Sequence, residues 1–404
     1  MVAHRVSPRI SLVPAICLGA VTAVCAQTDP GLQLRASETL MHDSNLFRLS
    51  DSANVNASTG KDSAADTVGI TTLGLSYNKA YSLQRIELDV SLVDNRFQNA
   101  DYLNFTASNY SAAWRWSFTP RLRGTLKSSR KEGLNSFSDY QNSTLRNLRT
   151  DTLTGFDALY ELTGAWRLLG GVSQTKQVNE QVLLVDSDYS FNSVFLGGRY
   201  DFSSGSTITY KATASNGSYL NRSLSAVDLT DDGFDQTESD LRLDWVVSGK
   251  LTASVNAGYA QRSHPHFAQR DYSGPQAGAS LNWDISGKTS LSADVSRKLG
   301  AYQSTYANYA RTDRLSVGPN WQISAKTTLG LSFDISHIDY LDSPFASNQI
   351  TRQDTLRDTR LSLVWQPSQS TFISASVSNA TRSSTLQGVD YRSHMATISA
   401  KYSY

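Results

Sequence analysis

Side chains able to do chemistry are sparse in this 404-residue chain. Beyond residue 26 it has five histidines, His42, His264, His266, His337 and His394. His264 and His266 flank a proline and could contact a metal ion, yet no cysteine or acidic residue lies in register with them. No serine, histidine and aspartate have the spacing of a hydrolase triad, and there is neither a phosphate-binding loop nor a dinucleotide fingerprint. The sequence therefore predicts no enzyme, no cofactor and no metal site.

Charged side chains are common, but they alternate with apolar ones. Between Arg85 and Val93 every second residue is isoleucine, leucine or valine, and arginine, glutamate, aspartate and serine stand between them. In a β-strand the two sets point to opposite faces. The alternation recurs in 18 segments of about 10 to 14 residues, the length of a tilted strand that crosses a bilayer. These segments are centred near residues 36, 73, 89, 113, 125, 155, 170, 196, 211, 242, 256, 280, 294, 317, 333, 361, 376 and 398.

The connections between these segments alternate between short turns and long polar loops. Short periplasmic turns and longer extracellular loops are typical of outer-membrane barrels, and an even strand number leaves both termini in the periplasm. The sequence therefore predicts an all-β fold: a transmembrane antiparallel up-and-down β-barrel of about 18 strands (16–18) over residues 27–404, in a bacterial outer membrane.

Aromatic residues support this prediction. All seven tryptophans lie on the apolar parity, within five positions of a predicted short turn. Aromatic side chains gather at membrane interfaces, whereas the core of a soluble sandwich gives no reason to keep every tryptophan near one end of the strands. The predicted periplasmic girdle comprises Trp114, Trp116, Trp166, Trp245, Trp283, Trp321 and Trp365.

A short repeat begins at three of these tryptophans. Trp245, Trp283 and Trp321 each start a six-residue stretch that ends in lysine, at spacings of 38 residues. A period near 40 also occurs in propellers, but a propeller blade holds four short strands, whereas each unit here holds two long ones. We interpret the repeat as a strand–turn–strand hairpin.

The chain ends on an alternating segment with Tyr402 and Tyr404 on its apolar parity. A last strand that ends on an aromatic residue resembles the signal read by the barrel insertion machinery, which we expect as a partner. The alternative is an ordinary amphipathic edge strand, but such an edge would invite aggregation unless it closes a barrel.

The first 26 residues are expected to be a signal peptide. Arg5 and Arg9 precede an apolar run that is short for a bilayer span, and small residues lead up to a cleavage site after Ala26. A lipoprotein anchored at Cys25 is the alternative. Because the only other cysteine is Cys17, the mature chain would hold no disulfide. Its net charge would be −1 instead of +1, which gives no basic field for nucleic acid.

The polar parity is expected to line an aqueous lumen, because barrels of about 16 to 18 strands enclose a channel. Basic residues are frequent from Arg115 to Lys127 and would attract anions, unless the charges pair across strands. Tyrosines of the predicted loops could stack on sugar rings; these are Tyr102, Tyr140, Tyr219, Tyr306 and Tyr340. The lumen candidates are Arg85, Glu87, Asp89, Arg115, Arg121, Arg123, Lys127, Arg149, Asp151, Arg167, Arg199, Lys211, Asp240, Arg242, Asp244, Asp294, Asp334, Arg360 and Lys401.

One motif is more specific than the alternation. Residues 43–49 read D-S-N-L-F-R-L, and a stretch at 81–85 is followed by Trp-Arg-Trp at 114–116. In these features the chain resembles outer-membrane barrel proteins of exopolysaccharide operons, the EpsL-type family. The resemblance implies a role in extracellular polysaccharide biosynthesis or export, with the polymer and other export proteins as partners. The motif residues that carry it are Asp43, Asn45, Leu46, Phe47 and Arg48. It supplies no catalytic residue.

The same motif follows the first predicted strand, where it could fold inward and constrict the lumen. The alternative is a structured loop held by the side-chain bonds of Asp43 and Asn45.

The leading hypothesis is therefore a passive outer-membrane barrel that serves polysaccharide secretion as a conduit or an accessory, with outer-membrane lipid around it. A general diffusion porin for small solutes is the first alternative. A structural or adhesive barrel plugged by its own loops is the second.

Overall fold

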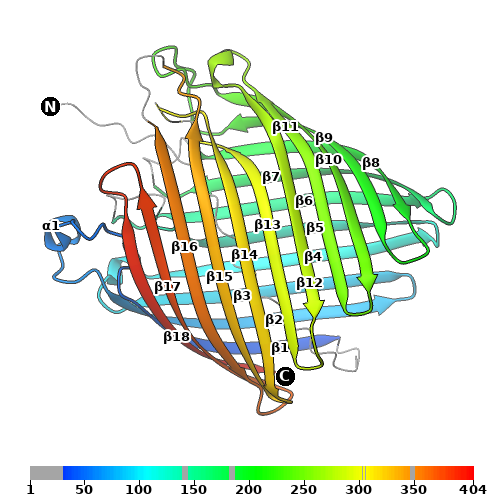
Figure 1. The fold of residues 1–404 in the computed structure, drawn as a ribbon, viewed down its shortest axis with the longest axis horizontal. Coiled ribbons are helices and arrows are strands. Elements are labelled where there is room, and N and C mark those ends of the chain that lie inside the picture. Colours follow the sequence, from blue (N-terminus) through cyan, green and yellow to red (C-terminus); the bar gives the residue numbers. More distant parts are fainter. Residues whose placement is uncertain (1–30, 139–143, 182–186, 303, 305, 346–350) are drawn as a thin grey trace.

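The computed structural model describes residues 31–138, 144–181, 187–302, 304, 306–345 and 351–404. The expected signal peptide and Tyr140 lie outside the described residues. Eighteen strands form one antiparallel sheet that curls round and closes on itself (Figure 1). They are β1 (Leu32–Asp43), β2 (Asp66–Tyr81), β3 (Gln84–Phe97), β4 (Phe105–Thr119), β5 (Leu122–Leu134), β6 (Leu148–Glu161), β7 (Trp166–Asn179), β8 (Tyr189–Asp201), β9 (Thr207–Tyr219), β10 (Gly233–Ser248), β11 (Leu251–Ser263), β12 (Tyr272–Asp284), β13 (Thr289–Ala301), β14 (Tyr309–Ser324), β15 (Thr327–Leu341), β16 (Arg352–Trp365), β17 (Thr371–Ser384) and β18 (Tyr391–Ser403).

Each predicted segment centre falls inside one of these strands, so the predicted barrel is confirmed. Every strand pairs with its neighbours in the chain, which is the up-and-down order. Among the described residues, three short helices stand in the loops: α1 (Val55–Thr59), η1 (Asp101–Leu103) and η3 (Ala268–Arg270). No helix in the described ranges is long and apolar enough to span a membrane.

The first and last strands close the barrel. β1 pairs with β18 in a continuous register from Arg35 opposite Ser403 to Asp43 opposite Met395. Leu34 and Tyr404 exchange both backbone hydrogen bonds, each 2.9 Å long. The C-terminal tyrosines therefore lie in the closing seam. Their use by the insertion machinery stays a prediction.

The alternation separates the side chains into an outer and an inner face. In β3 the residues from Ile86 to Leu92 with even numbers are exposed on the outside, and the odd-numbered residues between them are partly covered. Exposed leucine, valine and aromatic side chains also occupy the outer face of the other strands round the sheet. In a bilayer this outer belt contacts lipid, which is why a large apolar surface can remain uncovered by protein.

The tryptophan repeat corresponds to hairpins, as interpreted. Trp245, Trp283 and Trp321 each lie in the last few residues of a strand, directly before the short turns that lead into β11, β13 and β15. All of these strands belong to one closed sheet, which excludes propeller blades.

The tryptophans of the predicted girdle differ in exposure. Six of the seven tryptophans are 41–53% exposed on the outer face, whereas Trp116 is only 3% exposed. The Trp116 ring stacks on Phe156 with centroids 5.5 Å apart, and Phe118 packs 4.9 Å away. Gly124 is its cross-strand partner and leaves room for the indole. Trp116 is therefore packed into the wall instead of projecting into the interface.

This packing predicts that Gly124 tolerates no side chain. A Cβ there would come within 1.9 Å of the Asp157 carbonyl oxygen and 2.6 Å of the Trp116 ring. Gly124→Ala should therefore destabilise the barrel by about 1–3 kcal/mol, the usual cost of overpacking. Gly198→Ala is the matched control, since Gly198 is also a strand glycine and a Cβ there meets nothing within 4 Å.

The measurement is the temperature at which the folded barrel loses its compact migration in detergent gels. We expect a lower temperature for the Gly124 variant alone. Equal transition temperatures for the two variants would contradict this packing.

Candidate functional site

The inner wall of the barrel is the candidate site. The predicted lumen residues lie on the parity opposite to the lipid-facing belt, from Arg85 on β3 to Lys401 on β18. Arg121 is the exception. It lies in the turn between β4 and β5, where Thr119 Oγ1 accepts hydrogen bonds from the backbone of Arg121 and Leu122. The β4–β5 ladder passes a register shift after Ser117 and continues to Thr119 opposite Leu122, so Arg121 lies in the turn and is exposed at the periplasmic rim.

Most inner-wall charges form ion pairs. The pairs across strands or along one strand are Arg35–Asp89, Arg115–Glu87, Arg149–Asp151, Arg199–Asp201, Arg242–Asp244 and Arg314–Asp334. Arg167 lies between Glu161 at 3.6 Å and Asp201 at 3.1 Å. Partly exposed pairs of this kind contribute little stability, so they mainly fix side-chain positions and cancel charge. This agrees with the expectation that many lumen charges would pair.

Six of the predicted basic lumen residues are left over. Two of them are Arg360 on β16 and Lys401 on β18, and the other four lie on β3, β5 and β9. Arg85 on β3, Arg123 and Lys127 on β5, and Lys211 on β9 have no carboxylate within ion-pair distance among the residues that the structure describes. The Lys211 ammonium lies 5.2 Å from the centre of the Phe195 ring. The Asp157 carboxylate lines one hollow together with Arg85 and Arg123, so on this side of the lumen basic side chains outnumber acidic ones without excluding them.

Sequence reasoning missed several arginines of the inner wall. Arg35 and Arg314 have the same parity as the residues that were predicted, so the alternation alone could have found them. Arg352 and Arg382 stand at extracellular strand ends, where the apolar belt no longer marks the parity.

At the extracellular mouth, residues 43–49 form a tight turn. The Asp43 carboxylate is 1% exposed and accepts hydrogen bonds from the Asn45 backbone at 2.9 Å and the Ser393 hydroxyl at 2.6 Å. It also pairs with the Arg48 guanidinium at 2.8 Å. The Asn45 side chain bonds both the backbone N–H and the carbonyl of Leu49. Side-chain bonds of Asp43 and Asn45 thus hold the turn, as the alternative interpretation expected.

The apolar residues of this turn are buried against the barrel. Leu46, Phe47 and Leu49 form a cluster with Val68 of β2 and Phe97 of β3, both on inward-facing positions. Phe137, in the loop after β5, joins through an edge-to-face contact with Phe47 at 4.9 Å. The turn therefore folds against the inner side of the mouth. Its effect on passage through the lumen stays a prediction.

A second network fixes the mouth on β15–β17. The fully buried Arg352 donates to Asp354 at 2.8 Å and 3.2 Å, and to the hydroxyls of Tyr302 and Tyr306. Arg382 also bonds Asp354, and it donates to the Ser138 carbonyl oxygen at 2.6 Å. Ser138 follows β5, which is six strands away round the barrel. The loop after β5 therefore reaches across the mouth to β17.

The two histidines first considered for metal binding contact different carboxylates. His264 lies 3.3 Å from Asp271, whereas His266 lies 3.1 Å from Asp231. Ligand atoms of Asp231, Asp232 and His266 lie within 4.8 Å of one another. The buried Asp231 already accepts backbone hydrogen bonds from His266 and Phe267, so it serves to join the loops after β9 and β11.

The predicted loop tyrosines are found in several settings. The Tyr102 hydroxyl donates to the Thr144 carbonyl oxygen at 2.9 Å, and burial raises the pKa of this tyrosine. Tyr306 and Tyr340 belong to the Arg352 network. Tyr219 is the last residue of β9 and is buried.

Comparison with known proteins agrees with this architecture. Residues 239–404 match the family described as "Putative beta-barrel porin 2". No curated protein matches the chain by sequence.

Solved structures extend the likeness to nearly the whole chain. Pseudomonas aeruginosa OpdK with vanillate is 11% identical, with a TM-score of 0.51 over 92% of this chain and 99% of that one. P. aeruginosa OccK2 (OpdF) in complex with glucuronate is 13% identical, with a TM-score of 0.51 over 92% and 96%. A BenF-like porin from Pseudomonas fluorescens Pf-5 is 12% identical, with a TM-score of 0.52 over 92% and 99%.

At these identities the likeness shows the fold, which is that of outer-membrane porins. Together with the lipid-facing belt, it places the chain in a bacterial outer membrane, as predicted.

The mouth turn gives a first prediction. Asp43→Ala would remove the buried carboxylate that bonds Asn45, Ser393 and the half-buried Arg48, at a cost of about 1–3 kcal/mol. We expect trypsin to cut the folded protein after Arg48 much faster in this variant. Asp51→Ala is the control, because Asp51 is exposed in the same loop. Equal resistance of both variants to trypsin would show that Asp43 does not hold the turn.

His264 gives a second prediction. Burial lowers the pKa of His264 to about 4, although its hydrogen bond with Asp271 acts in the opposite direction. The folded loop therefore resists protonation, and its stability is full above pH 6.5 and falls as the pH drops from 6.5 towards 4. An NMR titration of the imidazole in the folded barrel should have its midpoint near pH 4. A midpoint near the ordinary 6.5 would mean that water reaches this ring.

Proposed function

We propose that this barrel is a passive diffusion pore for small hydrophilic solutes, with a preference for anions. The observation that carries the proposal is a closed 18-stranded barrel with a lipid-facing apolar exterior and a charged inner wall. A barrel of this strand number is wide enough for an aqueous lumen. The described inner wall presents ion pairs and polar side chains instead of a packed apolar core.

The preference for anions rests on the four unpaired basic side chains of β3, β5 and β9. Arg85 and Arg123 border one hollow near the periplasmic rim, where Arg115 and a single carboxylate, Asp157, also line it. Lys127 stands higher on the same strand as Arg123, and Lys211 stands on β9. A low-dielectric wall with uncompensated positive charge raises the local concentration of anions. Charged rings of this sign set anion selectivity in pores.

The ligands bound in two structural neighbours support the same class of solute. OpdK was solved with vanillate and OccK2 with glucuronate, and both compounds are small carboxylates. The neighbours share only the fold with this chain, so the support is for the size and charge of the solute.

The test is the reversal potential of the reconstituted barrel in a potassium chloride gradient. We expect chloride to be favoured over potassium. The double variant R123E/K127E should reduce or invert that preference, since each charge is worth on the order of 1 kcal/mol to an ion passing at about 4 Å in water.

Lys176→Glu is the matched control, because Lys176 points outward near the extracellular end of β7. An unchanged reversal potential in the double variant, or an equal change in the control, would overturn the assigned role of the β5 cations.

Polysaccharide secretion remains the second candidate. The motif at residues 43–49 favours it, because that motif carries the resemblance to EpsL-type proteins. Export through this lumen would require polymer to pass the mouth, where Phe47 and Phe137 pack against each other. The test is deletion and complementation in the native host, with released and cell-retained polysaccharide measured separately. Loss of released polymer supports this candidate, and unchanged polymer with slower uptake of small solutes supports the diffusion pore.

A further inference from the structure

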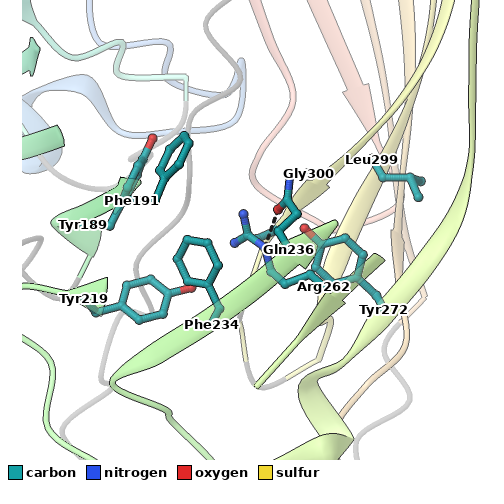
Figure 2. A pocket seen from close by; sticks show the side chains of 10 residues that line it. Tyr189, Phe191, Tyr219, Phe234, Gln236, Arg262, Tyr272, Leu299 and Gly300 are labelled. Atoms are coloured by element: carbon teal, nitrogen blue, oxygen red, sulfur yellow. Dashed lines mark hydrogen bonds between the residues drawn. The ribbon is translucent and has the colours of Figure 1, made fainter. Parts of the chain in front are cut away.

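A cavity of about 210 Å³ opens on the inner side of the wall at the extracellular ends of β8–β13. Aromatic rings from four strands surround it, and Figure 2 shows them facing one another across the space. Its lining includes Tyr189, Phe191, Tyr219, Phe234, Arg262 and Tyr272. The periplasmic hollow that contains Arg85 is a different place, at the other end of the strands.

Local backbone features make room for this cavity. The β12–β13 ladder ends at Ala277 opposite Arg297, although β12 begins five residues earlier at Tyr272 and β13 continues to Ala301. The two strands therefore part where the cavity lies. Gly217 of β9 lets the Phe234 ring lie against the backbone, since a Cβ there would approach that ring to 2.2 Å.

Two polar groups at the cavity have unused hydrogen-bonding capacity. Tyr219 is 5% exposed, and its hydroxyl has no hydrogen-bond partner among the described residues. In Figure 2 this hydroxyl points from β9 towards the Phe234 ring at the centre of the group. A buried hydroxyl without a partner is costly, so a native structure that keeps one calls for a ligand or water there.

The second group is the Arg262 guanidinium. Its Nε donates to Gln236 at 2.8 Å, which fixes the plane of the group. The plane lies 3.8 Å from the centre of the Phe234 ring and 5.8 Å from that of Tyr272. In the described part of the chain, the two terminal nitrogens have neither a carboxylate nor a carbonyl partner. Such a held, forked donor is suited to a carboxylate.

We propose that this cavity, the Arg262 pocket, binds a small aromatic carboxylate on its way through the lumen. The carboxylate would accept hydrogen bonds from the terminal nitrogens of Arg262. The ring would lie among Phe191, Phe234 and Tyr272, where offset and edge-to-face contacts are favourable. The Tyr219 hydroxyl would donate to the same ligand. This inference rests on the proposed diffusion pore, because it names the solute class and a place where the solute pauses.

The test is ligand-observed NMR on the folded, detergent-solubilised full barrel at pH 7, with benzoate as the probe. Benzyl alcohol keeps the ring without the charge, and acetate keeps the charge without the ring. We expect benzoate to bind about tenfold more tightly than either compound, since both a charged hydrogen bond and the ring contacts are needed. Equal binding of benzoate and benzyl alcohol, or of benzoate and acetate, overturns the proposal.

Variants locate the binding. R262M keeps the length of the side chain and should weaken benzoate about tenfold, whereas Y219F should weaken it about threefold. R357M removes the same charge from the outer wall of β16 and should leave benzoate affinity unchanged. Compact migration in detergent gels shows that each variant is folded. Unchanged affinity in folded R262M, or equal loss in R357M, places the binding elsewhere and overturns the assignment.

Failure of this site and failure of the pore can be told apart. Conductance of the reconstituted barrel is measured without benzoate, and binding is measured without a membrane. If the barrel conducts but R262M does not weaken benzoate, the pocket assignment fails and the pore stands. If benzoate binds through Arg262 but no current flows, the pocket stands and the pore fails.

Discussion

The need to pair every backbone polar group inside the bilayer is the constraint on which the rest of this structure depends. A hydrocarbon core offers no water to unpaired N–H and C=O groups, so a spanning sheet must close. Here the closure is the β1–β18 ladder, completed by the exchange between Leu34 and Tyr404. Once the sheet is closed, period-2 alternation gives every strand a lipid face and an enclosed face.

The enclosed face differs between the membrane-spanning part of the barrel and its extracellular mouth. Across the membrane, ion pairs fix most charges and leave a positive wall on β3, β5 and β9. At the mouth, long loops turn inward and are held by buried anchors such as Asp43, Arg352 and Arg270. Arg270 donates to the carbonyl oxygens of Asp228 and Leu229 in the loop after β9 and of Ser304 in the loop after β13, and burial lowers its pKa to about 10. These anchors hold the loops against the inner side of the mouth, where the cluster around Phe47 adds apolar packing.

The sequence predicts the barrel well, because the lipid face forces alternation on every strand. Strand number, hairpin order and the inward set from Arg85 to Lys401 all come from that pattern. Two local features escape it. Trp116 has the same parity as the other tryptophans, but its ring packs against Gly124. This position is possible only because the residue opposite Trp116 on the next strand is a glycine. Arg121 falls in the turn between Thr119 and Leu122, where the alternation of the strands no longer applies.

The mouth could not be predicted in the same way. Its anchors bring together residues hundreds of positions apart, such as Arg382 and Ser138, and no periodic signal relates them. The Arg262 pocket is also built from six strand ends, each contributing one or two side chains. The sequence suggests that Tyr219 could stack on sugar rings, but only the folded structure shows which side chains surround it. The motif at 43–49 predicted a held turn because its bonds are local in sequence.

The central claim is that the lumen is a continuous aqueous path for small solutes. Swelling of proteoliposomes tests it most directly, with the folded barrel in the bilayer and an isosmotic solution of a small neutral sugar outside. The account predicts swelling well above that of protein-free liposomes, and a rate that falls steeply as the sugar grows larger. No swelling from a barrel that migrates as folded protein would contradict the account and would indicate a barrel plugged by its own loops.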